Sequence, residues 1–141
     1  AEAGAASLCL RGGVEGEARA GAGAACGARR PVPVPAGAGA GAGITYLSGG
    51  GCREISHTIV NALAVTSGIV CDGAKSSCAA KISMAVEAGI LGFEMFRCGR
   101  QFYGGDGLVA KGVENSIANF SRLGRVGMRE TDKEIIRMMT E

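Results

Sequence analysis

The spacing of apolar residues predicts a series of amphipathic helices in the second half of the chain. Over residues 53–66, apolar side chains recur three and four positions apart, as one face of a helix requires: Ile55, Ile59, Val60 and Leu63. A second helix is expected over 77–96, where one face carries Ile82, Val86, Gly89, Ile90 and Phe93. Asp72, Ser76 or Ser77 could cap its first N–H groups, and Gly99 is expected to end it.

Two further helices are expected nearer the end of the chain. The apolar face of the first comprises Val109, Val113, Ile117, Phe120 and Leu123, with Gly124 and Gly127 closing it. Residues 131–134 form a capping-box sequence that predicts a short final helix. We expect Ile135, Ile136 and Met139 to face inward there, with Met138 and Met139 filling the core. No segment shows convincing strand alternation, so the predicted class is mainly α.

The composition changes abruptly near Ile44. Residues 1–43 hold 14 Ala, 11 Gly and all three prolines but no aromatic residue, whereas 44–141 hold all six aromatics. We therefore expect a low-complexity Ala/Gly/Pro-rich segment over 1–43 and a globular helical part over 44–141. Within 36–43, Ala and Gly alternate, which fits either a flexible tether or a helix that packs closely on a neighbour. Composition favours the tether.

Length and charge exclude several classes of protein. The 141 residues suffice for one modest domain. A net charge of +2 gives no electrostatic argument for nucleic acid, and no apolar run is long enough to predict a membrane span. We therefore expect neither partner. The predicted location is the cytosol, where clustered cysteines more often bind metal or perform chemistry than form disulfides.

Cys71 and Cys78 are the most informative of the six cysteines. They stand seven positions apart, across a turn that enters the predicted helix at 77–96. The free N–H groups at a helix start lower the pKa of a thiol, which suits an iron–sulfur cluster or a reactive cysteine. Two buried, inert thiols would also fit, and this spacing alone does not decide. No CxxC pair is present, which argues against zinc.

Two other motifs carry less information. His57, the single histidine, lies inside the first predicted helix, where a solvated or core imidazole is expected more often than a ligand or a base. Residues 105–110 match the GxGxxA pattern, but no strand precedes them, so a turn is predicted rather than a dinucleotide site.

Several sequence blocks together resemble one family. They are GITYL at 43–47, VCDGAK at 70–75, CAAK at 78–81, GLV at 107–109, VENSIAN at 113–119, GM at 127–128 and TDKEII at 131–136. In this order they resemble the cysteine desulfidase family, which is related to the alpha chain of iron–sulfur-dependent L-serine dehydratase. The resemblance runs from about Gly41 to the end. It implies the helical C-terminal portion of a serine dehydratase alpha-chain-like domain, because full-length members are several times longer.

The resemblance implies a cofactor and a reaction. It implies a [4Fe–4S] cluster held by three cysteines, with one iron left open as a Lewis acid for β-elimination. L-cysteine would give pyruvate, ammonia and hydrogen sulfide, and L-serine would give pyruvate and ammonia. Cys71 and Cys78 would be two ligands. Cys26 is the preferred third ligand and Cys52 the alternative, while Asp72, Lys75 and Asn115 are candidates for supporting or substrate contacts.

The segment around Cys26 departs from the family pattern, since the prolines at 31, 33 and 35 would break the small-residue helix of relatives. We hypothesise that residues 1 to about 37 derive from an altered reading frame or a misplaced gene start, in which case Cys26 loses its meaning as a ligand. The competing interpretation is an inactive helical remnant or interaction module with structural cysteines. A separate chain carrying the missing N-terminal part, and a homo-oligomer, both stay open as partners.

Overall fold

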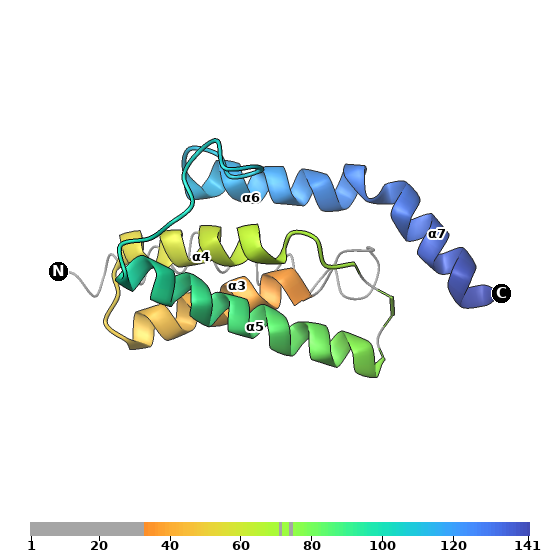
Figure 1. Cartoon of the computed structure of the whole chain (residues 1–141), viewed down its shortest axis with the longest axis horizontal. Coiled ribbons are helices and arrows are strands. Elements are labelled where there is room, and N and C mark those ends of the chain that lie inside the picture. Colours follow the sequence, from red (N-terminus) through yellow and green to blue (C-terminus); the bar gives the residue numbers. More distant parts are fainter. Residues whose placement is uncertain (1–32, 71, 74) are drawn as a thin grey trace.

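The computed structural model describes residues 33–70, 72, 73 and 75–141. Its helices are α3 (Pro33–Leu47), α4 (Cys52–Thr66), α5 (Ser76–Arg97), α6 (Val113–Arg122) and α7 (Arg129–Thr140), with a π-helical turn at Leu123–Gly127 between the last two. No strand occurs in the described part, and the predicted mainly α class is confirmed (Figure 1). None of these helices is both long and apolar enough to cross a membrane.

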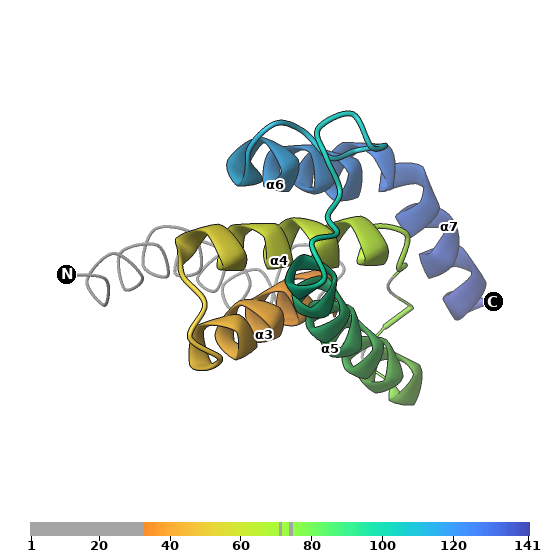
Figure 2. The ribbon, with the colours of Figure 1, turned by 60° about the vertical axis from the view of Figure 1, so that its left-hand side comes forward.

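The helices α3, α4 and α5 pack together, and α6 lies along α4 (Figures 1 and 2). The α4 helix runs antiparallel to α5, since Asn61 meets Gly92 while His57 stacks on Phe96. The buried core consists of Ala38, Ala42, Ile55, Ile59 and Leu63, with Val34, Val113, Ile117 and Phe120 packed against it. The apolar face predicted for residues 53–66 is therefore the face that α4 buries.

Residues 36–43 lie inside α3, which also crosses the expected boundary between residues 43 and 44. Of the two alternatives, the structure has the closely packed helix and not the tether. Ala38 and Ala42 are 1% and 0% exposed. A Cβ atom on Gly41 would lie 2.8 Å from the Cα of Gly89, which shows how closely the backbones of α3 and α5 approach.

The prolines do not prevent α3 from forming because they stand at its start. Pro33 is the first residue of the helix and Pro35 lies in the first turn. The N–H groups of a first turn have no partner within the helix, so a proline there removes no hydrogen bond. Pro31 and the rest of residues 1–32 lie outside the described residues.

The start of α5 differs from the prediction, whereas its end agrees. Lys75 is the N-cap residue and no side chain caps the helix. The prediction that Asp72, Ser76 or Ser77 caps it is therefore wrong. At the other end Gly99 has φ +69°. The N–H of Gly99 donates to the carbonyl of Phe96 at 2.9 Å, and the N–H of Arg100 donates to that of Met95 at 2.8 Å. These two bonds form a Schellman motif, which ends α5 at the predicted glycine.

The last helices depart further from the expected pattern. The α6 helix begins at Val113 rather than near Val109, and the chain stays helical through Gly124 up to Gly127. The α7 helix begins at Arg129 without a side-chain cap, so the capping box predicted at 131–134 is wrong. Residues 103–106 form a turn in which Asp106 accepts the N–H of Tyr103 at 2.6 Å, as expected for this loop.

The apolar residues of α7 are not in the core. Ile136, Met138 and Met139 are 42%, 62% and 49% exposed, so the predicted inward placement is wrong. Ile135 is half-buried. The helical periodicity correctly gave α7 an apolar face, but no residue of α7 is fully buried.

Asn61 is a buried polar link between three segments. Its Nδ2 donates to the carbonyl of Gly92 on α5 at 3.0 Å, and its Oδ1 accepts the N–H of Phe102 at 3.1 Å. Its exposed fraction is 0%. Asn61 thus fixes α4 both to α5 and to the loop that leads toward α6.

His57 has the structural environment expected from the sequence. Its ring stacks on Phe96, with 5.1 Å between the ring centroids. Partial burial lowers the pKa of His57, and the nearby Arg53 charge lowers it further, while Glu54 opposes the shift. The neutral imidazole is therefore the favoured form in the folded chain.

Candidate functional site

The candidate site lies where the chain enters α5. Cys78 is the third residue of this helix, and its thiol is half-buried. The N–H groups of Cys78 and Ala79 donate to the carbonyl of Lys75, at 3.0 and 3.3 Å. Iron–sulfur clusters bind cysteine sulfur, and a half-buried thiol stays accessible to such a ligand role. The position of Cys78 therefore suits a metal ligand.

The other two preferred ligands cannot be placed in the same way. Cys71 and Cys26 lie outside the described residues. Among the described residues, no group of three His, Cys, Asp or Glu side chains could hold a metal ion. The predicted three-cysteine set therefore stays a prediction, with one member, Cys78, located.

Cys52, the alternative third ligand, lies at the opposite end of the helix pair from Cys78. It is the first residue of α4, and the guanidinium carbon of its neighbour Arg53 is 6.0 Å from the Phe96 ring centroid. Phe96 follows Cys78 by 18 positions on α5, which corresponds to about 27 Å along an α-helix. A cluster is only a few ångströms wide. The structure therefore does not bring Cys52 and Cys78 together.

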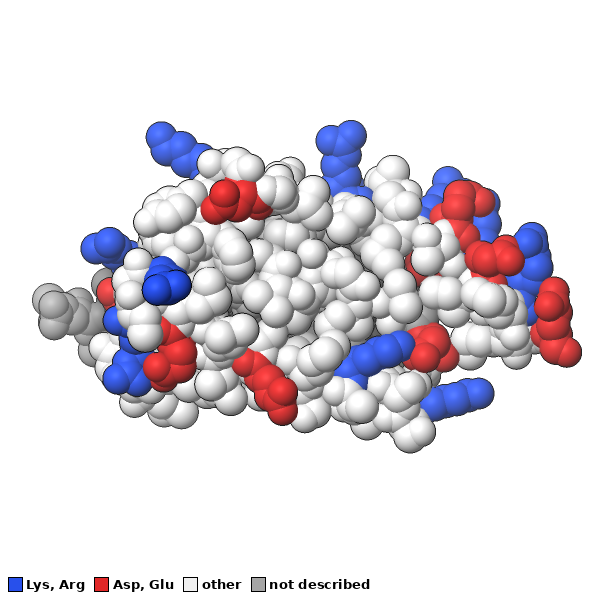
Figure 3. Space-filling view, in the orientation of Figure 1, with Lys and Arg blue, Asp and Glu red and all other residues white. Residues whose placement is uncertain are grey.

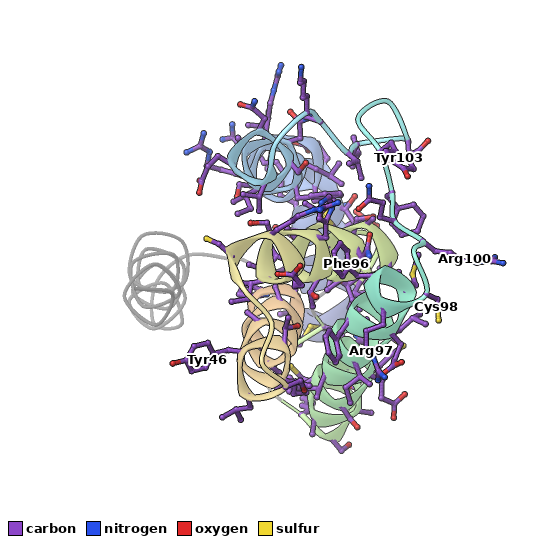
Figure 4. The ribbon with its side chains drawn as sticks, turned by 90° about the vertical axis from the view of Figure 1, so that its left-hand side faces the viewer. Tyr46, Phe96, Arg97, Cys98, Arg100 and Tyr103 are labelled. Carbon is purple, nitrogen blue, oxygen red and sulfur yellow. The ribbon has the colours of Figure 1, made fainter. Side chains whose placement is uncertain are left out.

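Cys98 is also far from the candidate site. It follows the last residue of α5 and is exposed. Figure 4 shows its side chain at the outer edge of the C-terminal end of α5, near Arg100, while Phe96 points toward α4. Cys98 therefore offers a control thiol at the far end of α5.

An ion pair beside Cys78 was missed by sequence reasoning. The Nζ of Lys81 lies 2.6 Å from Oδ1 of Asp72, and the hydroxyl of Ser77 donates to the same carboxylate at 3.3 Å. The hydrogen bond from Lys81 is the main cause that lowers the pKa of Asp72. The spacing of Ser77 and Lys81 placed both on one helix face, but no pattern in the sequence placed Asp72 against that face.

Lys75 and Asn115 make local backbone contacts. Lys75 begins α5 through its carbonyl, which accepts the two N–H groups described above. The Nδ2 of Asn115 donates to the carbonyl of Lys111 at 2.9 Å, just before α6. These bonds lie at the starts of α5 and α6 and are local to each helix. Asp72, in contrast, contacts the turn of α5 that carries Cys78.

The first turns of α5 are open on the described molecule. The first fully buried residue of α5 is Ala85, and residues 76–84 are exposed or half-buried. A Cβ atom on Gly73 would lie 3.0 Å from Cε of Met139, so the end of α7 reaches the loop before α5. Charged side chains on the face drawn in Figure 3 gather mainly toward the ends of the molecule. The half-buried thiol of Cys78 at an open helix start fits the thiolate donors that iron–sulfur clusters use.

Comparisons with known proteins identify relatives of the chain. The family model described as serine dehydratase alpha chain matches residues 12–137, which include most of the Ala/Gly/Pro-rich segment. A UPF0597 protein of Desulfitobacterium hafniense is 69% identical over 96 residues, covering 68% of this chain and 22% of the relative. A UPF0597 protein of Lachnoclostridium phytofermentans is 51% identical over 96 residues, covering 68% and 23% of the two chains. No solved structure matches.

The matches cover most of this chain but only a small part of each relative. A further UPF0597 protein, from Treponema denticola, is 43% identical over 96 residues and is covered over 22% of its length. The chain thus spans less than a quarter of these three relatives. The family model nevertheless matches far more than half of the chain itself. The chain therefore belongs to the serine dehydratase alpha-chain family, as the sequence blocks at 43–136 indicated.

Proposed function

We propose that this chain is the cluster-binding portion of an iron–sulfur-dependent amino-acid lyase. The reaction is β-elimination, from L-cysteine to pyruvate, ammonia and hydrogen sulfide or from L-serine to pyruvate and ammonia. The observation that carries the proposal is the half-buried thiol of Cys78 at the uncapped start of α5, seven positions after Cys71. Membership of the serine dehydratase alpha-chain family supports it.

In this proposal Cys71, Cys78 and Cys26 hold a [4Fe–4S] cluster. When bound, the cluster supplies an iron without a protein ligand, which acts as a Lewis acid toward the leaving group of the amino acid. The first turns of α5 are exposed or half-buried, so a small molecule could reach Cys78 from that side. A reducing compartment such as the cytosol would keep the ligands as thiols.

The alternative function is a small helical remnant or interaction module without activity. Its cysteines would pack as small apolar residues, as free cysteines commonly do. Cys78 is only half-buried, which favours a ligand over a packing residue. The two hypotheses differ in whether the chain binds iron at all.

Anaerobic reconstitution with iron and sulfide tests this difference. We expect the wild-type chain to become brown, with a broad absorbance in the violet and blue that sulfide-bridged iron produces. The variants Cys71→Ala and Cys78→Ala should lose most of it, because each removes a ligand. Cys98→Ala, at the C-cap of α5, is the matched control and should keep the wild-type spectrum. A colourless wild-type chain would support the remnant instead.

A second prediction concerns turnover by the isolated chain. The chain spans about 22% of the length of its relative from D. hafniense, and we infer that the groups that remove the Cα proton lie in the other part, whether on the same or on a separate chain. The reconstituted chain alone should therefore release no pyruvate from L-cysteine or L-serine. Pyruvate production by the purified chain, measured with a coupled assay, would contradict this inference.

A further inference from the structure

We propose that the apolar face of α7 is a docking surface for the remaining part of the serine dehydratase alpha-chain domain. This α7 face consists of Ile135, Ile136, Met138 and Met139. The inference deepens the proposed function, on which it rests only in treating the chain as one portion of a larger lyase domain. It names the partner of this chain and the surface that the partner covers.

The α7 helix has one apolar side and one charged side. At 3.6 residues per turn, the four residues of the α7 face fall within an arc of about 160°. The opposite side carries two ion pairs, Lys133 with Glu130 and Arg137 with Glu134. Acidic and basic side chains accordingly lie side by side over α7 in Figure 3. An apolar stripe opposite a charged one is typical of a helix that packs on another element.

The α7 face is largely exposed in the described part of the chain. Ile136, Met138 and Met139 are 42%, 62% and 49% exposed, and Ile135 is half-buried. The helix packs on the π-helical turn before it, and its end reaches Gly73, but neither contact buries the face. Neighbouring exposed apolar side chains mark interaction surfaces, and flexible methionines are common in them.

The length of the relatives indicates what covers this face. The D. hafniense relative is 69% identical to the chain, yet the match covers only 22% of that relative. Most of its sequence therefore lies outside the match. A larger domain buries a larger fraction of its surface, so a small portion of it exposes residues that the complete domain buries. The remaining part of the domain is thus the occupant that the comparison favours.

The α7 face also lies where further family sequence would join the described helices. Gly37 of α3 approaches Ala85 of α5, and Gly41 approaches Gly89, so the two helices run in the same direction. The α3 helix therefore begins toward the start of α5, and α7 ends beside the loop that precedes α5. Figure 1 shows both described ends on this side. Family sequence continuous with either end would leave close to the α7 face.

Co-expression with the rest of a relative tests the proposal. The full chain, with an affinity tag, is produced together with the part of the D. hafniense relative that lies outside the match. We expect both to be soluble and to copurify in about equal amounts. Ile136→Glu and Met139→Glu should each lower the copurified amount at least about tenfold, because they place an unpaired charge in an apolar interface. Lys133→Ala, on the charged side of α7, should match wild type.

The controls separate docking from folding and from self-association. Ile136 and Met139 are exposed in the chain alone, so circular dichroism of both glutamate variants should match wild type. A relative's part that stays insoluble, or that is not retained by the wild-type chain, would overturn the proposal. Glutamate variants that retain as much as wild type would overturn it too. So would a dimer of the chain alone that Ile136→Glu dissociates in light scattering, since a second copy would then occupy the face.

The copurification and the iron reconstitution fail independently of each other. A complex that forms but takes up no iron would contradict the proposed function and leave the docking surface in place. A chain that binds iron but does not retain the relative's part would contradict the docking surface alone.

Discussion

Replacing Gly89 by alanine is expected to lower the free energy of unfolding by about 1–3 kcal/mol. A Cβ atom there would lie 2.5 Å from the carbonyl oxygen of Gly37 and 2.9 Å from the amide nitrogen of Gly41. Both atoms belong to the backbone of α3, so no side chain can rotate away to relieve the contact. The helices must separate, and the close contact between α3 and α5 is lost. Urea denaturation followed by circular dichroism measures the effect.

Gly39→Ala is the matched control for this prediction. Gly39 also lies inside α3, but a Cβ atom on it would meet no atom of the described residues within 4 Å. Alanine is the better helix former by about 0.5–1 kcal/mol, so this variant should be more stable than wild type. Opposite signs for the two substitutions would support close packing of α3 on α5. Equal effects would show that residues 36–43 do not pack as described.

Replacing Asn61 by alanine is expected to lower the free energy of unfolding by about 2–4 kcal/mol. The variant leaves the carbonyl of Gly92 and the N–H of Phe102 without the partners that they have in wild type. Asn61 is fully buried, so water does not readily replace the amide. Thermal unfolding of the two proteins measures the difference.

An exposed asparagine provides the comparison for Asn61. The Nδ2 of Asn119 donates to the carbonyl of Leu108 at 3.0 Å, on the surface. Asn119→Ala should cost less than about 1 kcal/mol because water can hydrogen-bond that carbonyl in the variant. An Asn61→Ala chain as stable as Asn119→Ala would contradict the role given to Asn61.

The helices with large apolar residues could be predicted from the sequence, and α3 could not. Periodicity identifies α4 because Ile55, Ile59 and Leu63 are large enough to mark its buried face. Apart from Thr45, the buried face of α3 instead consists of Gly and Ala, whose contribution depends on how closely two backbones approach. Composition alone cannot distinguish such a closely packed Gly/Ala helix from a flexible linker. Ile136 and Met139 of α7 were wrongly predicted to be buried for another reason. Periodicity shows that a helix face is apolar, but not whether another element covers it.

The candidate site was only partly predictable because a local sequence pattern does not show which segments meet in the fold. The sequence placed Cys78 near a helix start, because a turn separates the periodic segments at 53–66 and 77–96. It left Cys52 open as a ligand, since proximity along the chain says nothing about which ends of antiparallel helices meet. The pairing of Lys81 with Asp72 depends on how the loop folds back on α5, which no local pattern encodes.

The central claim is that three cysteine thiolates of this chain hold a four-iron cluster with one iron open. Mössbauer spectroscopy of the chain reconstituted with ⁵⁷Fe tests it most directly. We predict about four iron atoms per chain in cubane-type signals, of which one in four changes when L-cysteine is added. The Cys78→Ala chain should lose these signals. A wild-type chain without bound iron, or a Cys78→Ala spectrum identical to that of wild type, would contradict the claim.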